Sequence, residues 1–282
     1  MDIFKRKNRI YVPVITEEIA KETLIRCSSC GRLINYKDLK NNLNVCPYCG
    51  HHFRMSIQER INLLTDTDTF KAINSDIEPL DVLNFYDGAY YKNQLAKVRQ
   101  ETGFNSALIT GKAKIDGVDV AIGAFSFEFI GGSLGFTEGE KIVKLFTYAK
   151  KNQLPVVVKF SSGGERIQEG VFSMLQIVRI IQAVDVFKED GGLFISILTN
   201  PVYGGASAIG MLGQFVFAEK DAMIGLTSPR ITQLAFGMNF SRELQSAEKL
   251  LENGFLDGVF ERKDLKSTIS KVLKIYTNRS LI

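Results

Sequence analysis

The chain has 282 residues, 45% hydrophobic and 23% charged, with a formal net charge of +4 at pH 7. These values are typical of a globular protein with one large domain and a buried core. The weak positive charge permits an anionic ligand but does not by itself predict nucleic-acid binding. Because neither a long apolar run nor the apolar core of a secretory signal is present, we expect a cytoplasmic protein without a membrane span.

Composition divides the chain into four segments. The predicted segments are a loosely ordered N-terminal arm (1–22), a zinc ribbon (23–52), a connecting helical region (53–106) and the main α/β domain (107–282). Within the connecting region, Ser56 and Glu59 form a capping-box pattern, which predicts the start of a helix. A second helix is predicted at 94–100.

All four cysteines lie in the second segment, as two CxxC pairs: Cys27 with Cys30, and Cys46 with Cys49. Each tight pair can deliver two thiolates to a tetrahedral zinc ion. Four cysteines complete the shell, so this zinc is predicted to be structural. Free or redox-active cysteines are the weaker alternative, and disulfides are disfavoured in a reducing compartment. A zinc ribbon alone also allows a nucleic-acid-binding module.

From about Ala107, apolar strands alternate with helices, which predicts α/β layering. Asp116-Gly117 separates the first two strands and is a strong hairpin signal. The predicted strands are 108–115, 118–127, 154–160, 193–199, 215–218 and 222–226, and the predicted helices are 138–149, 171–187, 206–214, 242–252 and 264–276.

Paired glycines stand at two predicted strand-to-helix junctions, Gly163-Gly164 and Gly204-Gly205. There the backbone N–H groups could stabilise a developing negative charge, assisted by the helix N-terminus. Close strand–helix packing is the alternative explanation. Neither junction matches a P-loop or a dinucleotide-binding pattern.

A third glycine segment, Gly131-Gly132-Ser133, could present its backbone to a ligand or be a flexible turn. No histidine follows position 52 and no cysteine follows position 49, so a hydrolase triad is not expected. This composition favours chemistry performed by backbone donors together with a cofactor.

The run from Cys27 to about Arg262 resembles the beta subunits of acetyl-CoA carboxylase carboxyltransferase. The resemblance rests on residues that match the family's motifs. They are the four cysteines with His51 and His52, Asp81-Val82-Leu83, Gln100-Glu101-Thr102-Gly103, Gly131-Gly132-Ser133, Ser162-Gly163-Gly164 with Arg166 and Gln168-Glu169-Gly170, Tyr203-Gly204-Gly205 with Ser207, and Pro229-Arg230. The resemblance implies a crotonase-like (ClpP/crotonase) α/β spiral of ββα units with a small N-terminal zinc ribbon.

The resemblance also implies transfer of a carboxyl group from carboxybiotin, carried on a biotin carboxyl carrier protein, to acetyl-CoA, giving malonyl-CoA. The implied partners are a separate alpha subunit, in an α2β2 assembly, and biotin carboxylase in the wider complex. In the implied mechanism the biotin ureido anion takes the methyl proton and the resulting enolate attacks CO2. The implied site residues are Gly163, Gly164, Gly204 and Gly205 as oxyanion donors, and Gly131, Gly132, Ser133, Arg166 and Arg230 as contacts of cofactor or coenzyme A.

The chain departs from the usual family pattern around the expected pocket. Glu165 stands where the family motif SGGARMQEG has alanine, Leu134 replaces the methionine of GGSMG, and the segments 225–235 and 237–244 are rewritten. These changes leave open a specialised paralogue that carboxylates or decarboxylates another acyl thioester, or an inhibitor-resistant copy. A nucleic-acid-binding zinc-ribbon protein is the third hypothesis.

Overall fold

The computed structural model describes residues 23–237 and 241–279. The predicted N-terminal arm, 1–22, lies outside this range. The chain folds as two compact units, the first ending at Phe53 and the second beginning at Arg54. No helix in the described ranges is long and apolar enough to cross a membrane.

The first unit is a small ribbon. Strands β1 (Leu24–Arg26) and β2 (Leu33–Asn35) pair antiparallel, and helix α1 (Tyr36–Asn41) follows directly. Asn35 begins this helix by accepting a hydrogen bond from the N–H of Lys37 at 2.9 Å, as an N-cap does. Ile34 and Leu39 pack with two of the cysteines in a separate small core.

The second unit is built on one mixed sheet. Its strands are β3 (Lys71–Ile73), β4 (Leu108–Ile115), β5 (Val118–Phe125), β6 (Val156–Ser162), β7 (Phe194–Tyr203), β8 (Phe215–Glu219), β9 (Ile224–Gly225) and β10 (Gly258–Phe260). The strand order is β10-β8-β7-β6-β5-β4-β3, and β9 pairs with β7. β3, β4 and β5 are antiparallel neighbours, whereas β5 to β10 run parallel.

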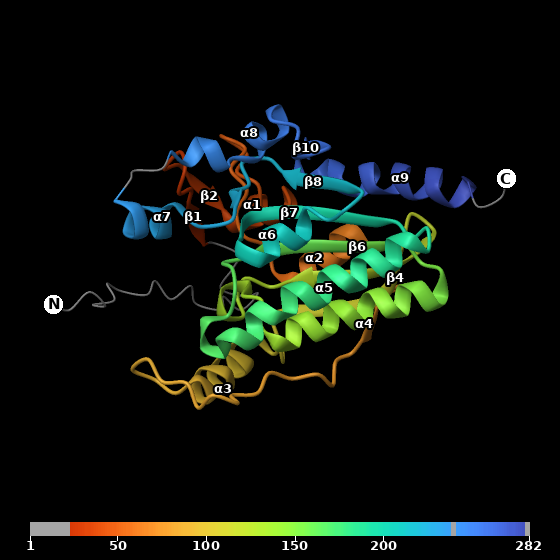
Figure 1. Ribbon diagram of the computed structural model, residues 1–282. Helices are drawn as coiled ribbons and strands as arrows, with labels where there is room; N and C mark the ends of the chain where they lie inside the picture. The colour runs from red at the N-terminus through yellow and green to blue at the C-terminus, as the bar shows by residue number, and fades with distance from the viewer. Residues whose placement is uncertain (1–22, 238–240, 280–282) are drawn as a thin grey trace. The chain divides into compact units, whose positions relative to one another are not determined.

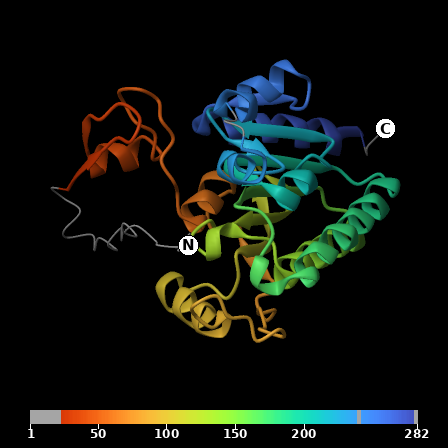
Figure 2. The ribbon, with the colours of Figure 1, turned by 60° about the vertical axis from the view of Figure 1, so that its left-hand side comes forward.

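The helices of the second unit are α2 (Ile57–Leu64), α3 (Tyr91–Thr102), α4 (Phe136–Asn152), α5 (Val171–Glu189), α6 (Gly204–Gly210), α7 (Pro229–Phe236), α8 (Ala247–Glu252) and α9 (Leu265–Arg279). Short 3₁₀ turns lie at Ile130–Gly132, Ile167–Glu169, Arg242–Gln245 and Arg262–Asp264. Figures 1 and 2 both show α4 and α5 side by side.

The sheet buries both of its faces because successive strand residues point to opposite sides. On β6, Val156, Val158 and Phe160 pack in one core with α4 and α5. Val157 packs in a second core with Leu265 and other residues of α9. The central strands β6 and β7 therefore carry buried apolar residues on both faces, as expected of parallel strands covered on both sides.

Most of the predicted elements are confirmed, and the local signals explain why. Ser56 and Glu59 form the capping box at the start of α2. Asp116 and Gly117 take positive φ values of 50° and 84° in the hairpin between β4 and β5, the conformation that a type I′ turn requires.

Two helix predictions are wrong in part, and two helices, α1 and α7, are absent from the prediction. The helix predicted at 242–252 is split, because Ser246 is extended (φ −73°, ψ 148°) and caps α8 by accepting from the N–H of Lys249. α6 ends at Gly210, short of the predicted 214. α7 is missing from the prediction although Ser228 caps it and Pro229 opens it, which is a recognised start signal.

Candidate active site and zinc centre

The four cysteines converge as predicted. Their sulfur atoms all lie within 4.8 Å of one another. Sγ of Cys27 is 3.7 Å from that of Cys49, and Sγ of Cys30 is 3.9 Å from that of Cys46. A tetrahedral site with Zn–S bonds of about 2.3 Å requires sulfur–sulfur separations of roughly 3.8 Å. The arrangement therefore fits a zinc ion held by Cys27, Cys30, Cys46 and Cys49.

The backbone shapes the two CxxC turns. Gly31 and Gly50 each follow a CxxC pair with φ of 72° and 73°, and each closes a turn onto the first cysteine of its pair. The N–H of His51 is the main cause that lowers the pKa of the Cys49 thiol to about 7. The His51 ring nitrogen Nε2 lies 3.1 Å from the hydroxyl of Ser28, so this histidine is occupied outside the metal shell.

We expect Cys46→Ser to lose its zinc, because a hydroxyl is a poor replacement for a thiolate in a closed four-cysteine site. Elemental analysis should find about one zinc ion per wild-type chain and almost none in the variant. His51→Ala is the matched control and should keep its metal. Unchanged zinc in Cys46→Ser, or metal loss in His51→Ala, would contradict the ligand assignment.

Three glycine segments that lie far apart in the sequence meet at one corner of the second unit. The N–H of Gly163 donates to the carbonyl of Gly131 at 2.8 Å. The N–H of Leu134 donates to the carbonyl of Gly164 at 2.9 Å. A Cβ built on Gly204 would lie 2.9 Å from the Cα of Gly164. The loop after β5, the loop after β6 and the start of α6 therefore touch.

Backbone crowding explains why glycine is required here. Gly132 has φ of 64°, and a Cβ there would collide with the carbonyl oxygen of Ser161. Gly204 has φ of 62°, and a Cβ there would collide with the Glu165 carboxylate. Both conformations are rare for residues with a side chain.

All four N–H groups predicted as oxyanion donors have an acceptor within the chain. They are Gly163 to Gly131 O (2.8 Å), Gly164 to Ser162 Oγ (3.1 Å), Gly204 to Leu226 O (3.1 Å) and Gly205 to Glu165 Oε1 (2.7 Å). A ligand must therefore replace an existing bond at each donor that it uses. The role of these groups as oxyanion donors stays a prediction.

The two glycine pairs differ in their relation to a helix. Gly204 and Gly205 are the first residues of α6, as predicted. Gly163 and Gly164 are followed by a 3₁₀ turn, and α5 begins only at Val171. The segment 161–170 precedes α5 as predicted, but the 3₁₀ turn and Gly170 (φ 53°) separate the first glycine pair from the helix. Helix N-terminal assistance is thus confined to the second pair.

Arg166, predicted to contact cofactor or coenzyme A, has a wholly buried side chain. Such a contact stays a prediction. Its guanidinium donates to the hydroxyl (2.9 Å) and the carbonyl (2.6 Å) of Ser133 and forms an ion pair with Glu138 at 3.1 Å. Ser133, which is also buried, uses its own hydroxyl to bond the carbonyl of Ile130. Both side chains hold the two glycine loops together.

Three residues of this network, Glu138, Glu169 and Tyr91, are absent from the predicted site residues. Glu138 accepts from the N–H groups of Ala107 (2.8 Å) and Gly135 (3.0 Å). Glu169 accepts from the hydroxyl of Tyr91 at 2.7 Å. Burial raises the pKa of Tyr91, which therefore stays neutral. The sequence could have predicted Glu138 as a capping residue from its place at the third position of α4. No short-range sequence pattern predicts the role of Tyr91.

The other contact predicted beyond the glycines, Arg230, is exposed in the first turn of α7. The segment before it is tied to the corner, since the carbonyl of Leu226 accepts from the N–H of Gly204. Gln245 supports this segment by donating to the carbonyl of Thr227 at 2.7 Å. A contact between Arg230 and a coenzyme stays a prediction.

Comparison with known proteins identifies this architecture. Residues 54–277 match the family described as "Carboxyl transferase domain", and residues 25–49 match the "Acetyl-CoA carboxylase zinc finger domain". The chain belongs to the carboxyl transferase family. The ribbon match includes all four cysteines, Cys27, Cys30, Cys46 and Cys49.

Relatives of similar length extend this assignment. The acetyl-coenzyme A carboxylase carboxyl transferase subunit beta of Prochlorococcus marinus subsp. pastoris is 37% identical over 92% of this chain and 89% of its own length. The protein of the same name from strain NATL1A of P. marinus is 33% identical over 98% of this chain and 95% of its own. The resemblance to carboxyltransferase beta subunits is therefore confirmed.

Solved structures confirm the crotonase-like fold of this carboxyl transferase. Transcarboxylase 12S, solved with methylmalonyl-coenzyme A bound, is 25% identical, with a TM-score of 0.66 over 84% of this chain and 42% of that chain. A Pseudomonas malonate decarboxylase hetero-dimer is 20% identical, with a TM-score of 0.60 over 79% of this chain and 86% of that one. The second likeness concerns the fold alone.

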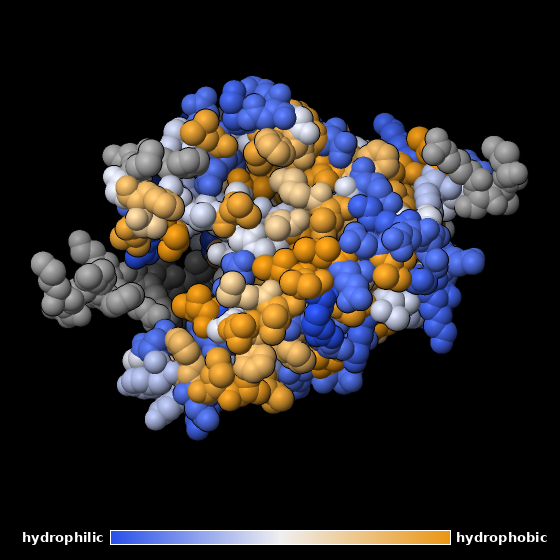
Figure 3. Space-filling model, viewed as in Figure 1, coloured by the Kyte–Doolittle hydropathy of each residue, from blue (hydrophilic) through white to orange (hydrophobic). Residues whose placement is uncertain are grey.

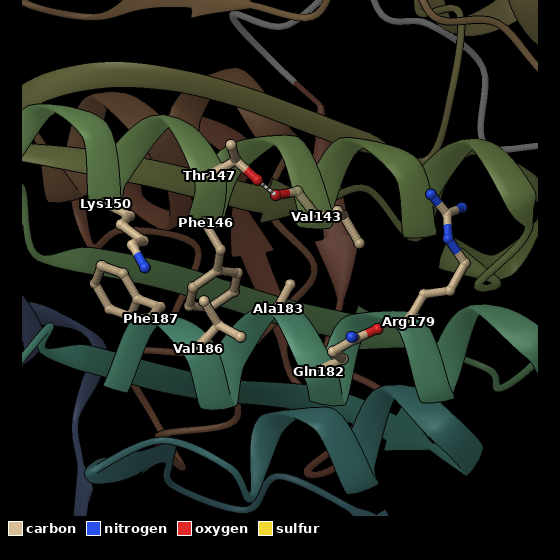
Figure 4. A pocket seen from close by; sticks show the side chains of 9 residues that line it. All are labelled: Val143, Phe146, Thr147, Lys150, Arg179, Gln182, Ala183, Val186 and Phe187. Carbon is tan, nitrogen blue, oxygen red and sulfur yellow. Dashed lines mark hydrogen bonds between the residues drawn. The ribbon is translucent and has the colours of Figure 1, made fainter. Parts of the chain in front are cut away.

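A groove of about 390 Å³ lies away from the glycine corner, between α4 and α5 (Figure 4). It is lined by Val143, Phe146, Thr147, Lys150, Arg179, Gln182, Ala183, Val186 and Phe187. Its two cations are already paired, Lys150 with Asp190 at 3.2 Å and Arg179 with Glu140 at 2.6 Å. The groove contains none of the predicted site residues.

Proposed function

We propose that this carboxyl transferase works as the beta half of a two-chain enzyme that transfers a carboxyl group from carboxybiotin to acetyl-CoA, giving malonyl-CoA. The observation that carries the proposal is the meeting of Gly131-Gly132, Gly163-Gly164 and Gly204-Gly205 at one corner. Histidine and cysteine are confined to positions up to 52. The chemistry of this chain therefore depends on its main-chain amides.

These amides can stabilise the enolate of a thioester. When a substrate oxygen replaces the internal acceptor of an N–H group, the hydrogen bond strengthens as negative charge develops on that oxygen. The gain is on the order of 3 kcal/mol for each donor. Carboxybiotin, when bound, supplies the CO2 and a ureido anion that removes the methyl proton. The chain itself binds and orients the thioester.

The partners that we propose are a carboxyltransferase alpha subunit, in an α2β2 assembly, the biotin carboxyl carrier protein and biotin carboxylase. One surface supports a protein partner. Val171, Met174, Leu175 and Val178 lie on one side of α5 at helical spacing and are 51–66% exposed; we call this the α5 apolar face. Figure 3 shows hydrophobic surface gathered where α5 runs. Contiguous exposed apolar surface of this kind is typical of an interface.

We expect Val178→Asp to prevent stable assembly with the alpha subunit, because it places a charge on the α5 apolar face. Association should weaken by about tenfold or more, measured by sedimentation of the co-expressed subunits. The matched control is Ile275→Asp on α9, where the wild-type side chain is similarly exposed (62%, against 66% for Val178). If the two variants assembled equally well, the α5 apolar face would not be part of the interface.

The function itself is tested by co-expressing the chain with its alpha subunit and following carboxyl transfer from carboxylated carrier protein to acetyl-CoA. We expect malonyl-CoA to form in proportion to the carboxylated carrier consumed. The assay also includes malonyl-CoA alone. Loss of its carboxyl group without any turnover of acetyl-CoA would overturn the proposal.

A second candidate is a paralogue that acts on another acyl thioester, by carboxylation or decarboxylation. The specific observation in its favour is the carboxylate of Glu165 bound to the Gly205 N–H, within the proposed pocket. A panel of acyl-CoA substrates in the same assay separates the two candidates. We propose a cytoplasmic site of action for either, because four thiolate ligands require a reducing compartment.

A further inference from the structure

The carboxylate of Glu165 rests on the Gly204-Gly205 corner. Its Oε1 atom accepts a hydrogen bond from the N–H of Gly205 at 2.7 Å. Its Oε2 atom lies so close to Gly204 that a Cβ on that glycine would collide with it. In the proposed function the Gly205 N–H donates to the thioester oxygen. In the free chain the same N–H donates to the Glu165 carboxylate.

This bond belongs to the stronger class of hydrogen bonds, because the acceptor is a carboxylate oxygen and the separation is short. Within the part of the chain that the structure describes, no lysine or arginine forms an ion pair with Glu165. The Gly205 amide is therefore the polar group that holds this carboxylate in place. The side chain is only half-buried, so water can solvate it once it is displaced.

The backbone on both sides of Glu165 is fixed. The N–H of Leu134 donates to the carbonyl of Gly164 at 2.9 Å, and the N–H of Arg166 donates to the carbonyl of Leu134 at 2.8 Å. The neighbouring Arg166 side chain is anchored in the buried network. Freeing the Gly205 N–H therefore requires rotation of the Glu165 side chain and not movement of the loop.

A thioester oxygen and the Glu165 carboxylate exclude each other. A backbone N–H carries one hydrogen, and it cannot make a good hydrogen bond to two acceptors at once. Each thioester that uses this donor must break the internal bond. Its apparent affinity therefore falls as the fraction of chains in which Glu165 accepts from the Gly205 N–H rises.

We propose that Glu165 is a specificity-determining residue, which occupies the oxyanion position of the free chain and weakens the binding of every acyl thioester that must displace it. This inference rests on the proposed function, because it assumes that the Gly205 N–H serves the thioester. Only thioesters whose remaining contacts compensate for the lost internal bond are then bound well.

The test compares Glu165→Ala and Glu165→Gln with the wild-type chain, each assembled with its alpha subunit. Calorimetry should show acetyl-CoA binding about tenfold more tightly to the alanine variant, because no charged competitor is left. The glutamine variant, which keeps a neutral acceptor, should bind about threefold more tightly. KM should fall by the same factors while kcat changes little.

Glu189→Ala, an exposed carboxylate at the end of α5, is the matched control and should bind as the wild type does. Unchanged or weaker binding in both Glu165 variants would overturn the inference, and so would a large loss of kcat in both. Glutamine keeps the size of the side chain, so the question can still be answered if the alanine variant does not assemble. If no form transfers a carboxyl group, the proposed function fails, whereas the calorimetric affinities still decide the role of Glu165.

Discussion

Gly204→Val should reduce kcat/KM for carboxyl transfer by about 100-fold or more, the effect of losing one preorganised oxyanion donor. Gly204 has φ of 62°, and a Cβ there would collide with Glu165 and lie 2.9 Å from the Cα of Gly164. The start of α6 must shift away from the other two glycine segments to accept a side chain. The measurement is steady-state kinetics of the assembled enzyme, with zinc content and assembly recorded in parallel.

The matched control separates crowding from backbone strain. Gly254 has a similar φ of 76°, and a Cβ there would meet no atom within 4 Å. Gly254→Val should therefore share the strain of a left-handed conformation and retain activity. Gly204→Ala is the milder second variant, in case the valine variant does not assemble. Near-normal activity of both Gly204 variants would exclude this corner from the reaction site.

Arg166→Ala should destabilise the second unit by about 3–5 kcal/mol, because it leaves two buried carboxylates without their cation. Arg166 is 3.1 Å from Glu138 and 3.6 Å from Glu169, and all three side chains are buried. Its guanidinium stays charged, because burial opposes the charge but Glu138, Tyr91 and Glu169 together raise its pKa. Urea unfolding of the full chain measures the free-energy change.

Arg179→Ala is the control for this prediction. Its ion pair with Glu140 is shorter, at 2.6 Å, but the Arg179 side chain is 41% exposed. Pairs in contact with water contribute about 1 kcal/mol or less. If the free energy of unfolding fell by the same small amount in both arginine variants, burial of the ion pair would not contribute the expected stability. Arg166 would then not be the anchor of the glycine loops.

The buried network and the corner are connected through Ser133. Arg166 holds the hydroxyl and carbonyl of Ser133, and Ser133 follows the two glycines whose loop meets Gly163. The same peptide segment carries the Glu165 side chain on one side and the Arg166 side chain on the other. The half-buried Glu165 is thus followed directly by a buried residue that anchors the loop.

Short-range features were determined by the sequence itself. The four zinc ligands lie within two CxxC turns, whose geometry is local, and the hairpin at Asp116-Gly117 depends on two residues that accept positive φ. The capping box of α2 is likewise a contact between residues three apart. The glycine pairs, the apolar strands and the family resemblance also required no coordinates.

The tertiary structure alone decided which residues meet at the site. Arg166 matches a family motif and carries a charge that predicts exposure, yet it is wholly buried, because Ser133 and Tyr91 reach it from 33 and 75 positions away. The Gly205 N–H finds its acceptor 40 positions away, in Glu165. Sequence spacing specifies geometry over a few residues, within one turn or one cap. Contacts across a sheet depend on which strands become neighbours, and only the packed core determines that order.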